Sequence, residues 1–393
     1  MSQSSHDTHE HAEPDDAPGW HAIDTALQAV YGDQEPWHTG SVLKFALGGD
    51  DPLDGISIYR NEQERPHWHY VTYGFTELYG PPDEDDEKDS AAELNDDDVG
   101  DSADEDDTED DENLSGYGFE LTFRLAIADG ETEPPAWPVS LMQNLARYVF
   151  RTANVFEPGH WMTANGPICL GSDTLLTEMA FVQDPQLPPI DSPQGKLSFL
   201  QIVGLTADEL RESKRWNSRG ALQAMQPHMP LFINDLARPS LHDQPDVRAA
   251  ITHGQETEGS STAFIFASVL GIERHKRLLR GDQITITLGC LAVSDLKQLL
   301  PARLPHGGAL MLSSGEHLLS FEPAEQGVQL RWDSDTSLTL ALGPQPLQAW
   351  RQSVKARTGD YQVPGIDHVI WRVEASVIRD REGNVVSVYE EAE

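Results

Sequence analysis

The stretch GFELTFRLAI, residues 118–127, decides the fold class of this chain. Apolar side chains recur at every second position, at Phe119, Leu121, Phe123, Leu125 and Ile127. A period of two places side chains on one face of an extended segment, whereas a helix requires a period of about 3.6. The stretch therefore predicts a half-buried β-strand, whose alternate polar or small side chains face away from the core.

The segments on either side of this strand predict a mixture of helices and strands. PAWPVSLMQNLARYVF, residues 135–150, predicts a helix in which Leu141, Leu145 and Val149 share one face. Further helices are expected at 19–30, 206–216, 243–252, 295–300 and 346–357. Strands are expected at 41–47, 56–59, 68–75, 179–182, 197–203, 262–267 and 284–288, with a closing hairpin at 369–378 and 385–389.

No regular βαβ alternation runs through the chain, so these elements predict an α+β protein. A length of 393 residues is typical of two domains. We expect two mixed α/β lobes, at residues 19–267 and 270–393.

The charge of the chain limits the classes of partner. It carries 66 Asp and Glu against 27 Lys and Arg, a formal net charge of −39. Nucleic acids and anionic membranes bind basic surfaces, so neither is predicted as a partner.

No apolar run reaches about 18 residues, and the N-terminus lacks the pattern of a signal peptide. Two cysteines are too few for a disulfide framework, which fits a reducing compartment. We therefore expect a cytoplasmic location.

Nearly half of this charge lies in one block. From Asp83 to Glu112 there are 19 acidic residues and one lysine, a net charge of −18 over 30 residues. Such a segment cannot bury enough apolar surface to offset its ordering entropy. We predict a disordered insertion at 82–115 and a disordered tail at 1–18. An acidic surface for a basic partner is the alternative role of the insertion.

One alternative hypothesis is a metal-dependent enzyme. His67 and His69 lie two residues apart on a predicted strand and therefore share a face, where both imidazoles could reach one zinc ion. His160 is a conceivable third ligand. The other interpretation is a pair of histidines hydrogen-bonded within a packed sheet, and it is favoured because no spacing rule supplies the third ligand.

Other catalytic candidates are weaker still. Phosphate-binding, serine-nucleophile and zinc-protease motifs are all missing from the chain. Cys169 has no neighbouring histidine, and Cys290 lies in an apolar strand-like segment, so both are interpreted as packed thiols. The acids of GGDDPLDG, residues 48–55, fit a turn as well as they fit catalysis. The sequence predicts no enzyme, no metal and no cofactor.

Several long strings in the chain resemble a known family. LGGDDPLDGISIYRN (47–61), HWHYVTYGFTELYG (67–80) and DPQLPPIDSPQGKLSFLQIVGLTADEL (184–210) are similar to the N-terminal domain of Suppressor of fused. The strand and helix quoted above continue this match in the same order, over about residues 19–267. Residues 270–393 resemble the C-terminal domain of the family more weakly, through LPHGGALML (304–312). The chain resembles a compact, prokaryotic-type member.

The resemblance implies a non-enzymatic protein that clamps a partner peptide as an added strand between its two domains. In animals the family restrains Gli-type zinc-finger transcription factors; for bacterial relatives the proposed role is an immunity protein that neutralises a toxin. The matching strings imply partner contacts at Tyr148, Asp184, Ile265 and Ala267. Helix packing for Tyr148 and a turn for Asp184 are the structural alternatives.

Two departures from the family separate this chain from Gli recognition. The acid that the family carries beside the histidine after the LARYVF helix is missing near His160, and His306 stands where the family has a glutamate. We therefore expect an immunity role first and a regulator that sequesters a transcription factor second. The net charge predicts that the partner is neutral or basic.

Overall fold

The computed structural model describes residues 17–40, 49, 51–79, 113–276, 282–379 and 384–392. Most of the predicted tail, the predicted strand at 41–47 and most of the acidic insertion lie outside these residues. Of the residues assigned to the tail and the insertion, Pro18 begins a helix, and Leu114 and Ser115 lie in a strand. The described residues form two compact units. One holds the residues up to Ala207 together with Gln226–Ser240, and the other holds Asp208–Met225 together with the residues from Leu241 onward. The domain boundary expected between 267 and 270 stays a prediction.

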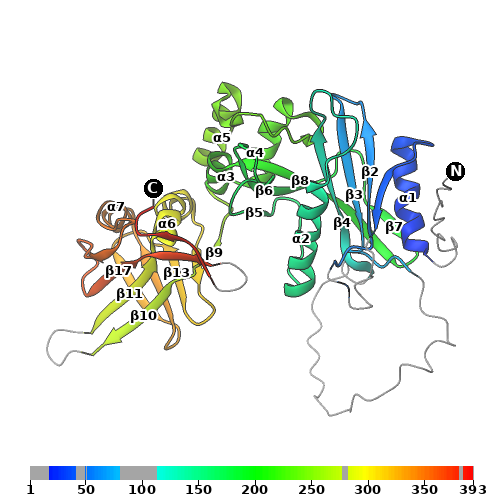
Figure 1. The fold of residues 1–393 in the computed structure, drawn as a ribbon. Helices are drawn as coiled ribbons and strands as arrows, with labels where there is room; N and C mark the ends of the chain where they lie inside the picture. Colours follow the sequence, from blue (N-terminus) through cyan, green and yellow to red (C-terminus); the bar gives the residue numbers. More distant parts are fainter. Residues whose placement is uncertain are drawn as a thin grey trace, which may run out of the picture. The chain divides into compact units, whose positions relative to one another are not determined.

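The first unit is built on an eight-stranded sheet (Figure 1). Its strand order is β1-β2-β3-β4-β8-β6-β5, and β7 also pairs with β8. The β4–β8 pair is parallel, and the other pairs are antiparallel. The strands are β1 (Trp37–Gly40), β2 (Gly55–Asn61), β3 (His67–Tyr73), β4 (Leu114–Ala126), β5 (Trp161–Thr163), β6 (Leu176–Gln183), β7 (Ile190–Ser192) and β8 (Gly195–Thr206).

A helix packs against each face of this sheet. Helix α1 (Pro18–Tyr31) buries Ile23 and Leu27 in a cluster with residues of β2, β3, β7 and β8. Helix α2 (Trp137–Thr152) buries Met142, Leu145 and Val149 against the apolar side chains of β3 and β4. Figure 1 shows the two helices on opposite sides of the strands. Two short 3₁₀ turns, η3 (Gln226–His228) and η4 (Pro230–Phe232), also belong to this unit.

The prediction of a strand at 118–127 is confirmed, but the prediction that it is half-buried is wrong. Glu120, Thr122 and Arg124 lie on its polar face and are fully buried. The reason is that α1 and the chain after β6 cover this face, so β4 is enclosed on both sides. Buried polar groups need hydrogen-bond partners, and the network described below provides them.

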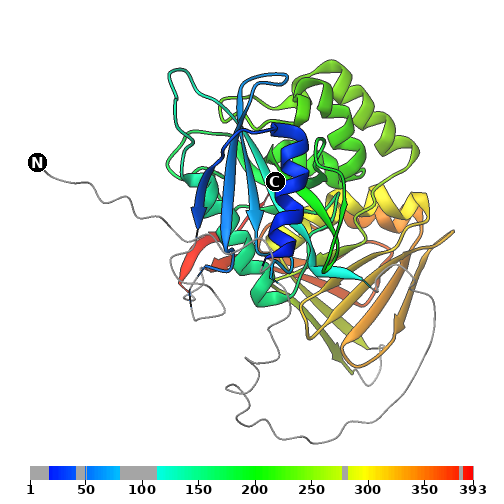
Figure 2. The same cartoon turned by 90° about the vertical axis from the view of Figure 1, so that its right-hand side faces the viewer.

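The second unit combines helices with two larger sheets and a hairpin (Figure 2). The sheets have the orders β10-β11-β17-β16 and β14-β15-β13-β12-β9, and β18 pairs with β19 alone. The strands are β9 (Phe264–Phe266), β10 (Leu270–His275), β11 (Gln283–Gly289), β12 (Leu310–Ser313), β13 (Leu318–Pro323), β14 (Val328–Trp332), β15 (Ser337–Leu342), β16 (Gly359–Tyr361), β17 (Val369–Glu374), β18 (Ser376–Arg379) and β19 (Val385–Tyr389). The helical segments are α3 (Ala207–Lys214), α4 (Ser218–Met225), η5 (Leu241–Asp243), α5 (Pro245–Thr257), α6 (Cys290–Arg303), η6 (Leu304–His306) and α7 (Pro344–Ser353).

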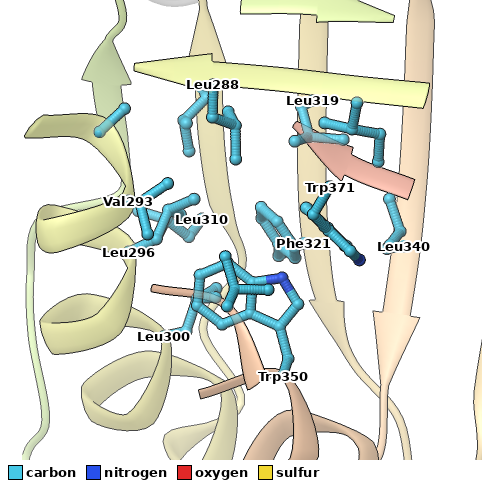
Figure 3. Packing of buried hydrophobic residues seen from close by; sticks show 14 of the residues in the cluster. Leu288, Val293, Leu296, Leu300, Leu310, Leu319, Phe321, Leu340, Trp350 and Trp371 are labelled. Atoms are coloured by element: carbon cyan, nitrogen blue, oxygen red, sulfur yellow. The ribbon is translucent and has the colours of Figure 1, made fainter. Parts of the chain in front are cut away.

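One apolar core joins both sheets to α6 and α7 (Figure 3). At its centre the ring of Trp350 meets that of Trp371 edge-on, with centroids 5.5 Å apart. Phe321 contributes a third ring, 6.3 Å from each of the two. Leucines of α6 and of the strands surround these rings, so the second unit has a core of its own. The predicted α+β architecture of two mixed lobes is confirmed.

The end of the chain differs in detail from the prediction. The strand expected at 369–378 is divided at Ala375 into β17, which runs parallel to β11, and β18, which forms the hairpin with β19. The helix expected at 346–357 ends at Ser353, where Val354 adopts an extended backbone and buries its side chain in the core. Among the helices of the described residues, none is long and apolar enough to cross a membrane.

Candidate partner-binding site

The predicted contact Asp184 lies inside the first unit, at the end of β6. Its side chain is fully buried and faces the guanidinium of Arg124, which donates to Oδ2 at 2.5 Å and to Oδ1 at 3.0 Å. His69 Nε2 lies 3.3 Å from Oδ2, and the Thr122 hydroxyl donates to the same oxygen at 2.7 Å. Strand register explains why Arg124 and His69 lie together, because Arg124 of β4 is paired directly with His69 of β3.

The same carboxylate also shapes the chain that follows it. Asp184 Oδ1 accepts the backbone N–H groups of Gln186 and Leu187, at 2.8 and 3.0 Å. This is the turn predicted as the structural alternative for an aspartate before a proline. Arg124 further donates to the side-chain oxygens of Gln186 and Gln201. The carboxylate is thus occupied by contacts within its own unit, and a partner contact for Asp184 stays a prediction.

Burial and charge oppose each other in this cluster. Burial alone would raise the pKa of Asp184, but Arg124 and His69 together hold that pKa well below its usual range. For His69, burial and the neighbouring Arg124 lower the pKa to about 4, although Asp184 favours the charged form. The imidazole is therefore neutral at pH 7, and its Nδ1 shares a 2.6 Å hydrogen bond with the hydroxyl of Tyr31.

The metal alternative finds no ligand set in the described parts of the chain. Within them, no three His, Cys, Asp or Glu side chains gather as a metal site would require. His67 Nδ1 lies 2.8 Å from the carbonyl of Arg65, and His69 bonds as above, so both contribute to packing and hydrogen bonding within the sheet. His160, the conceivable third ligand, lies 3.8 Å from Glu157 and is half exposed.

The other catalytic candidates have structural surroundings. Cys290 is buried at the start of α6, and its thiol donates to the carbonyls of Glu374 and Glu390. Asp51 forms an ion pair with Arg147 at 2.5 Å. The contacts of Cys290 match the packed-thiol interpretation, while the turn interpretation of the acids at 48–55 stays a prediction. Asp50 lies outside the described residues.

Glu120 is a buried acid that the strand pattern did not single out. Its Oε1 accepts the backbone N–H groups of Gly74, Phe75 and Thr76 at 3.0–3.1 Å, together with the Thr76 hydroxyl at 2.7 Å. The Thr72 hydroxyl bonds to Oε2 at 2.6 Å. Burial raises the pKa of Glu120 to about 7, while these hydrogen bonds oppose the shift. The signal in the sequence was an acidic residue within an alternating strand. That signal does not show that Glu120 is buried, because the burial depends on α1 covering this face of the sheet.

Tyr148 provides an exposed aromatic surface on α2. Its side chain is 37% exposed, and its ring stacks on Phe156 with centroids 5.8 Å apart. Phe156 stacks in turn on Phe181 of β6 at 4.1 Å, which anchors the arrangement to the sheet. Tyr148 therefore both packs and remains accessible, and its role as a partner contact stays a prediction.

Ile265 and Ala267 belong to the second unit, where β9 forms one edge of the five-stranded sheet. Ile265 packs against the core, and Ala267 is buried with its N–H donating to Ser313 O at 2.8 Å. The adjacent Phe264 and Phe266 behave differently, because their side chains are 49% and 71% exposed. Sequence reasoning missed these two phenylalanines. Their alternation with Ile265 was the available signal, since successive strand residues face opposite sides of the sheet.

Comparisons with known proteins place this chain among relatives. A family model described as Suppressor of fused protein matches residues 49–95 and 99–239. The chain is 35% identical over 261 residues to the Suppressor of fused homologs of Homo sapiens and Mus musculus. That match covers 63% of this chain and 49% of each relative, so the chain spans about half the length of these curated relatives.

Two solved structures extend the comparison. The crystal structure of Drosophila Suppressor of Fused matches with a TM-score of 0.63 at 22% identity, over 96% of this chain and 98% of that one, which shows a shared fold. A structure of the Sufu–Fu complex matches with a TM-score of 0.50 at 32% identity, over 60% of this chain and 98% of that one. The similarity in sequence therefore extends over nearly the full length of one solved relative.

Proposed function

Because this chain belongs to the Suppressor of fused family, we propose that it acts by binding a partner protein and not by catalysis. A relative solved in the Sufu–Fu complex supports protein binding as the activity of the family. The observation that carries the proposal for this chain is the apolar, unpaired edge of β9.

Among the described residues, one edge of β9 has no partner strand. Ala267 N–H donates to Ser313 O, and Met311 N–H donates to Ala263 O, so these residues point their backbone polar groups toward β12. Backbone direction alternates along a strand, which turns the N–H and C=O groups of Phe264 and Phe266 toward the open edge. In the described part of the chain, β12 alone pairs with β9. An extended segment can therefore be added at this edge.

The side chains beside this edge are apolar. Phe264 and Phe266 project on one face, and Met311, the register partner of Phe264, is 39% exposed. The opposite edge strand β14 instead carries Arg331, which pairs with Glu322 and Asp333. Charged side chains discourage strand addition. The charged edge at β14 therefore disfavours an added strand, whereas the apolar edge at β9 can accept one.

The partner is a neutral or basic segment with apolar side chains at alternate positions. The net charge of −39 favours such a partner, and the two phenylalanines would contact its apolar side chains. A toxin bound by an immunity protein is the first candidate class, and a sequestered transcription factor is the second. Inactivation of a captured toxin by the wild-type chain would support the first class, and loss of a transcriptional effect would support the second.

Substitution at the β9 edge is expected to abolish capture of the partner. In affinity capture from the native cell, Phe264→Asp/Phe266→Asp should weaken binding at least about thirtyfold, because buried aromatic anchors dominate interface energies. Leu330→Asp on β14 is the matched control, since it also places a charge at an exposed apolar edge position. Equal capture by both variants would refute the assignment of the site to β9.

A second pair of variants separates backbone from side-chain contributions. Phe266→Ala removes the ring but keeps the outward N–H, and Phe266→Pro removes both. Strand addition predicts that the proline variant binds more weakly than the alanine variant, because proline cannot donate to the added strand. Retained β9–β12 amide signals in a spectrum of each variant would show that the sheet is intact. Identical affinities would indicate contact through side chains alone and contradict strand addition.

A further inference from the structure

A pocket in the second unit concentrates positive charge. Its volume is about 560 Å³, and its lining includes Lys297 of α6, Arg351 of α7, and Lys355 and Arg357 of the segment after α7. One carboxylate, that of Glu391, faces these four cations. Helices α6 and α7 are in contact, as Figure 1 also shows, so the cations of both helices reach the same hollow.

The local sequence explains why these cations converge. Ser294, Lys297 and Gln298 of α6 are spaced at i, i+3 and i+4, which places them on one face of the helix. After α7 ends, the residues alternate, with Val354 and Ala356 buried and the two cations between and after them exposed. The packing of the apolar pair in the core thus turns Lys355 and Arg357 outward.

The last described residues complete the wall of the pocket. Ala392 N–H donates to Ala356 O at 2.8 Å, and Thr358 N–H donates to Glu390 O at 3.0 Å. These backbone bonds hold the end of the chain beside the cationic segment. The pocket is therefore held by backbone hydrogen bonds on one side and by two packed helices on the other.

Two arginines in this pocket lack the partners that other arginines of the chain have. Several exposed or partly exposed arginines form ion pairs with Asp or Glu, namely Arg60, Arg65, Arg147, Arg248, Arg274, Arg331 and Arg372. Throughout the described ranges, no carboxylate lies within ion-pair distance of the guanidinium of Arg351 or Arg357. In a chain with 66 acidic residues, this arrangement leaves a site open to an external anion.

The charges of the pocket also act against one another. Partial burial, Lys355 and Arg351 all lower the pKa of Lys297. Its ammonium group has a weak contact with Val354 O at 3.4 Å, and that of Lys355 bonds to Gln352 O at 2.8 Å. A bound anion would reduce the repulsion among these cations, and this reduction would contribute favourably to the free energy of binding.

We propose that this pocket binds a phosphorylated ligand. A phosphate monoester carries a charge of about −1.5 to −2 and three acceptor oxygens, which suits several cations better than a single carboxylate does. Arginine can donate two parallel hydrogen bonds to such a group. A second pocket of about 440 Å³ shares Gln298 and Arg351 with the first, and gives room for the remainder of the ligand. The phosphoryl group can come from a small polyphosphate or from a phosphorylated protein segment.

Titration calorimetry of the full chain tests this proposal with defined probes. The probes are inorganic tripolyphosphate, a phosphoserine peptide, the same peptide with serine, and citrate as a carboxylate of comparable charge. We expect tripolyphosphate or the phosphopeptide to bind, with affinity falling as salt is raised from about 0.05 to 0.5 M. Which of the two binds more tightly identifies the source of the phosphoryl group. Failure of both to bind at low salt, or equal binding of citrate, would overturn the proposal.

Substitutions connect the binding to the pocket. Arg351→Gln/Arg357→Gln should weaken binding at least about tenfold, because charge-assisted hydrogen bonds are lost. Arg331→Gln, at an exposed position of the same unit, is the matched control and should bind like the wild type. Equal affinity of the double variant would overturn the assignment. The site shares no residue with the β9 edge, so the two proposals can fail independently.

Discussion

Replacing Arg124 with glutamine is expected to lower the free energy of unfolding of the first unit by about 3–5 kcal/mol. The substitution leaves the Asp184 carboxylate buried without the cation that faces it at 2.5 Å. Hydrogen bonds from Thr122, Gln186 and Leu187 remain, but neutral donors do not neutralise a buried charge. Urea unfolding checks the result, read from the indole N–H signals of buried Trp68 in the first unit and Trp371 in the second.

Matched variants distinguish the effect of breaking a buried ion pair from the effect of replacing an arginine at an exposed position. Arg60→Gln removes an ion pair with Glu62 whose side chains are 44% and 61% exposed, and should cost about 1 kcal/mol or less. Arg124→Met/Asp184→Leu removes both buried charges and should cost less than the sum of the two single variants. A loss below about 1 kcal/mol for Arg124→Gln would show that the buried pair does not stabilise the unit.

This placement of Asp184 changes how a binding experiment must be interpreted. A variant such as Asp184→Arg buries a second cation beside Arg124 and is expected to unfold the first unit. Loss of partner capture by that variant would then report lost structure and not a lost contact. Tyr148→Ala, at a half-exposed position, is the better test of a partner contact in this unit.

Acidification is expected to destabilise the first unit through two buried histidines. Burial lowers the pKa of His69 to about 4 and that of His67 to about 3 in the folded state. In the unfolded chain both would have a pKa of about 6.5. Below pH 6.5 the unfolded chain therefore binds protons that the folded unit does not. The free energy of unfolding consequently decreases as the pH is lowered. As the pH is lowered from 6.5 to 4, each histidine is expected to reduce the free energy of unfolding by about 3 kcal/mol.

Glu120 acts in the opposite direction. Because burial raises its folded pKa to about 7, from an ordinary value of 4.5, its contribution to stability is present below pH 4.5 and is lost as pH rises through 7. One acid opposes two imidazoles between pH 4.5 and 6.5, so the net stability still rises with pH. Asp184 remains ionised throughout this range, because Arg124 and His69 outweigh the effect of burial and hold its pKa well below the ordinary value.

The pH prediction can be checked with the same Trp68 signal. Unfolding free energies at pH 6.5, 5.5 and 4.5 should decrease in that order. His69→Gln should reduce the slope by about 1.4 kcal/mol per pH unit, because one titrating group is removed. Gln28→Ala, at an exposed position of α1, is the control and should leave the slope unchanged, because it removes no titrating group. A slope that His69→Gln does not alter would contradict the role of His69.

Local sequence patterns predicted the elements of the fold well where the pattern was strong. The alternation at 118–127 and the helical face of Leu141, Leu145 and Val149 correspond to β4 and α2. The strand expected at 369–378 was too long, because period-two apolarity continues across Ala375 although the chain changes its pairing partner there. A pattern of side chains contains no information on which strand lies alongside.

The candidate site was predictable only in part, for the same reason. The resemblance placed partner contacts on the strand that ends the first matched region, and that strand is an edge strand. It identified Ile265 and Ala267, whose side chains face the core or are buried, and not Phe264 and Phe266. Choosing between the two faces requires knowing which of them the core of the second unit covers.

The sequence by itself determined the family, the mixed α+β class and the strongly acidic charge of the chain. Tertiary structure alone decided which polar residues are buried and which apolar residues are exposed. Arg124 and Asp184 lie 60 residues apart in the chain and meet because the turn after β6 brings Asp184 over the polar face of β4. Local periodicity shows which side chains share a face, whereas burial depends on what distant segment covers that face.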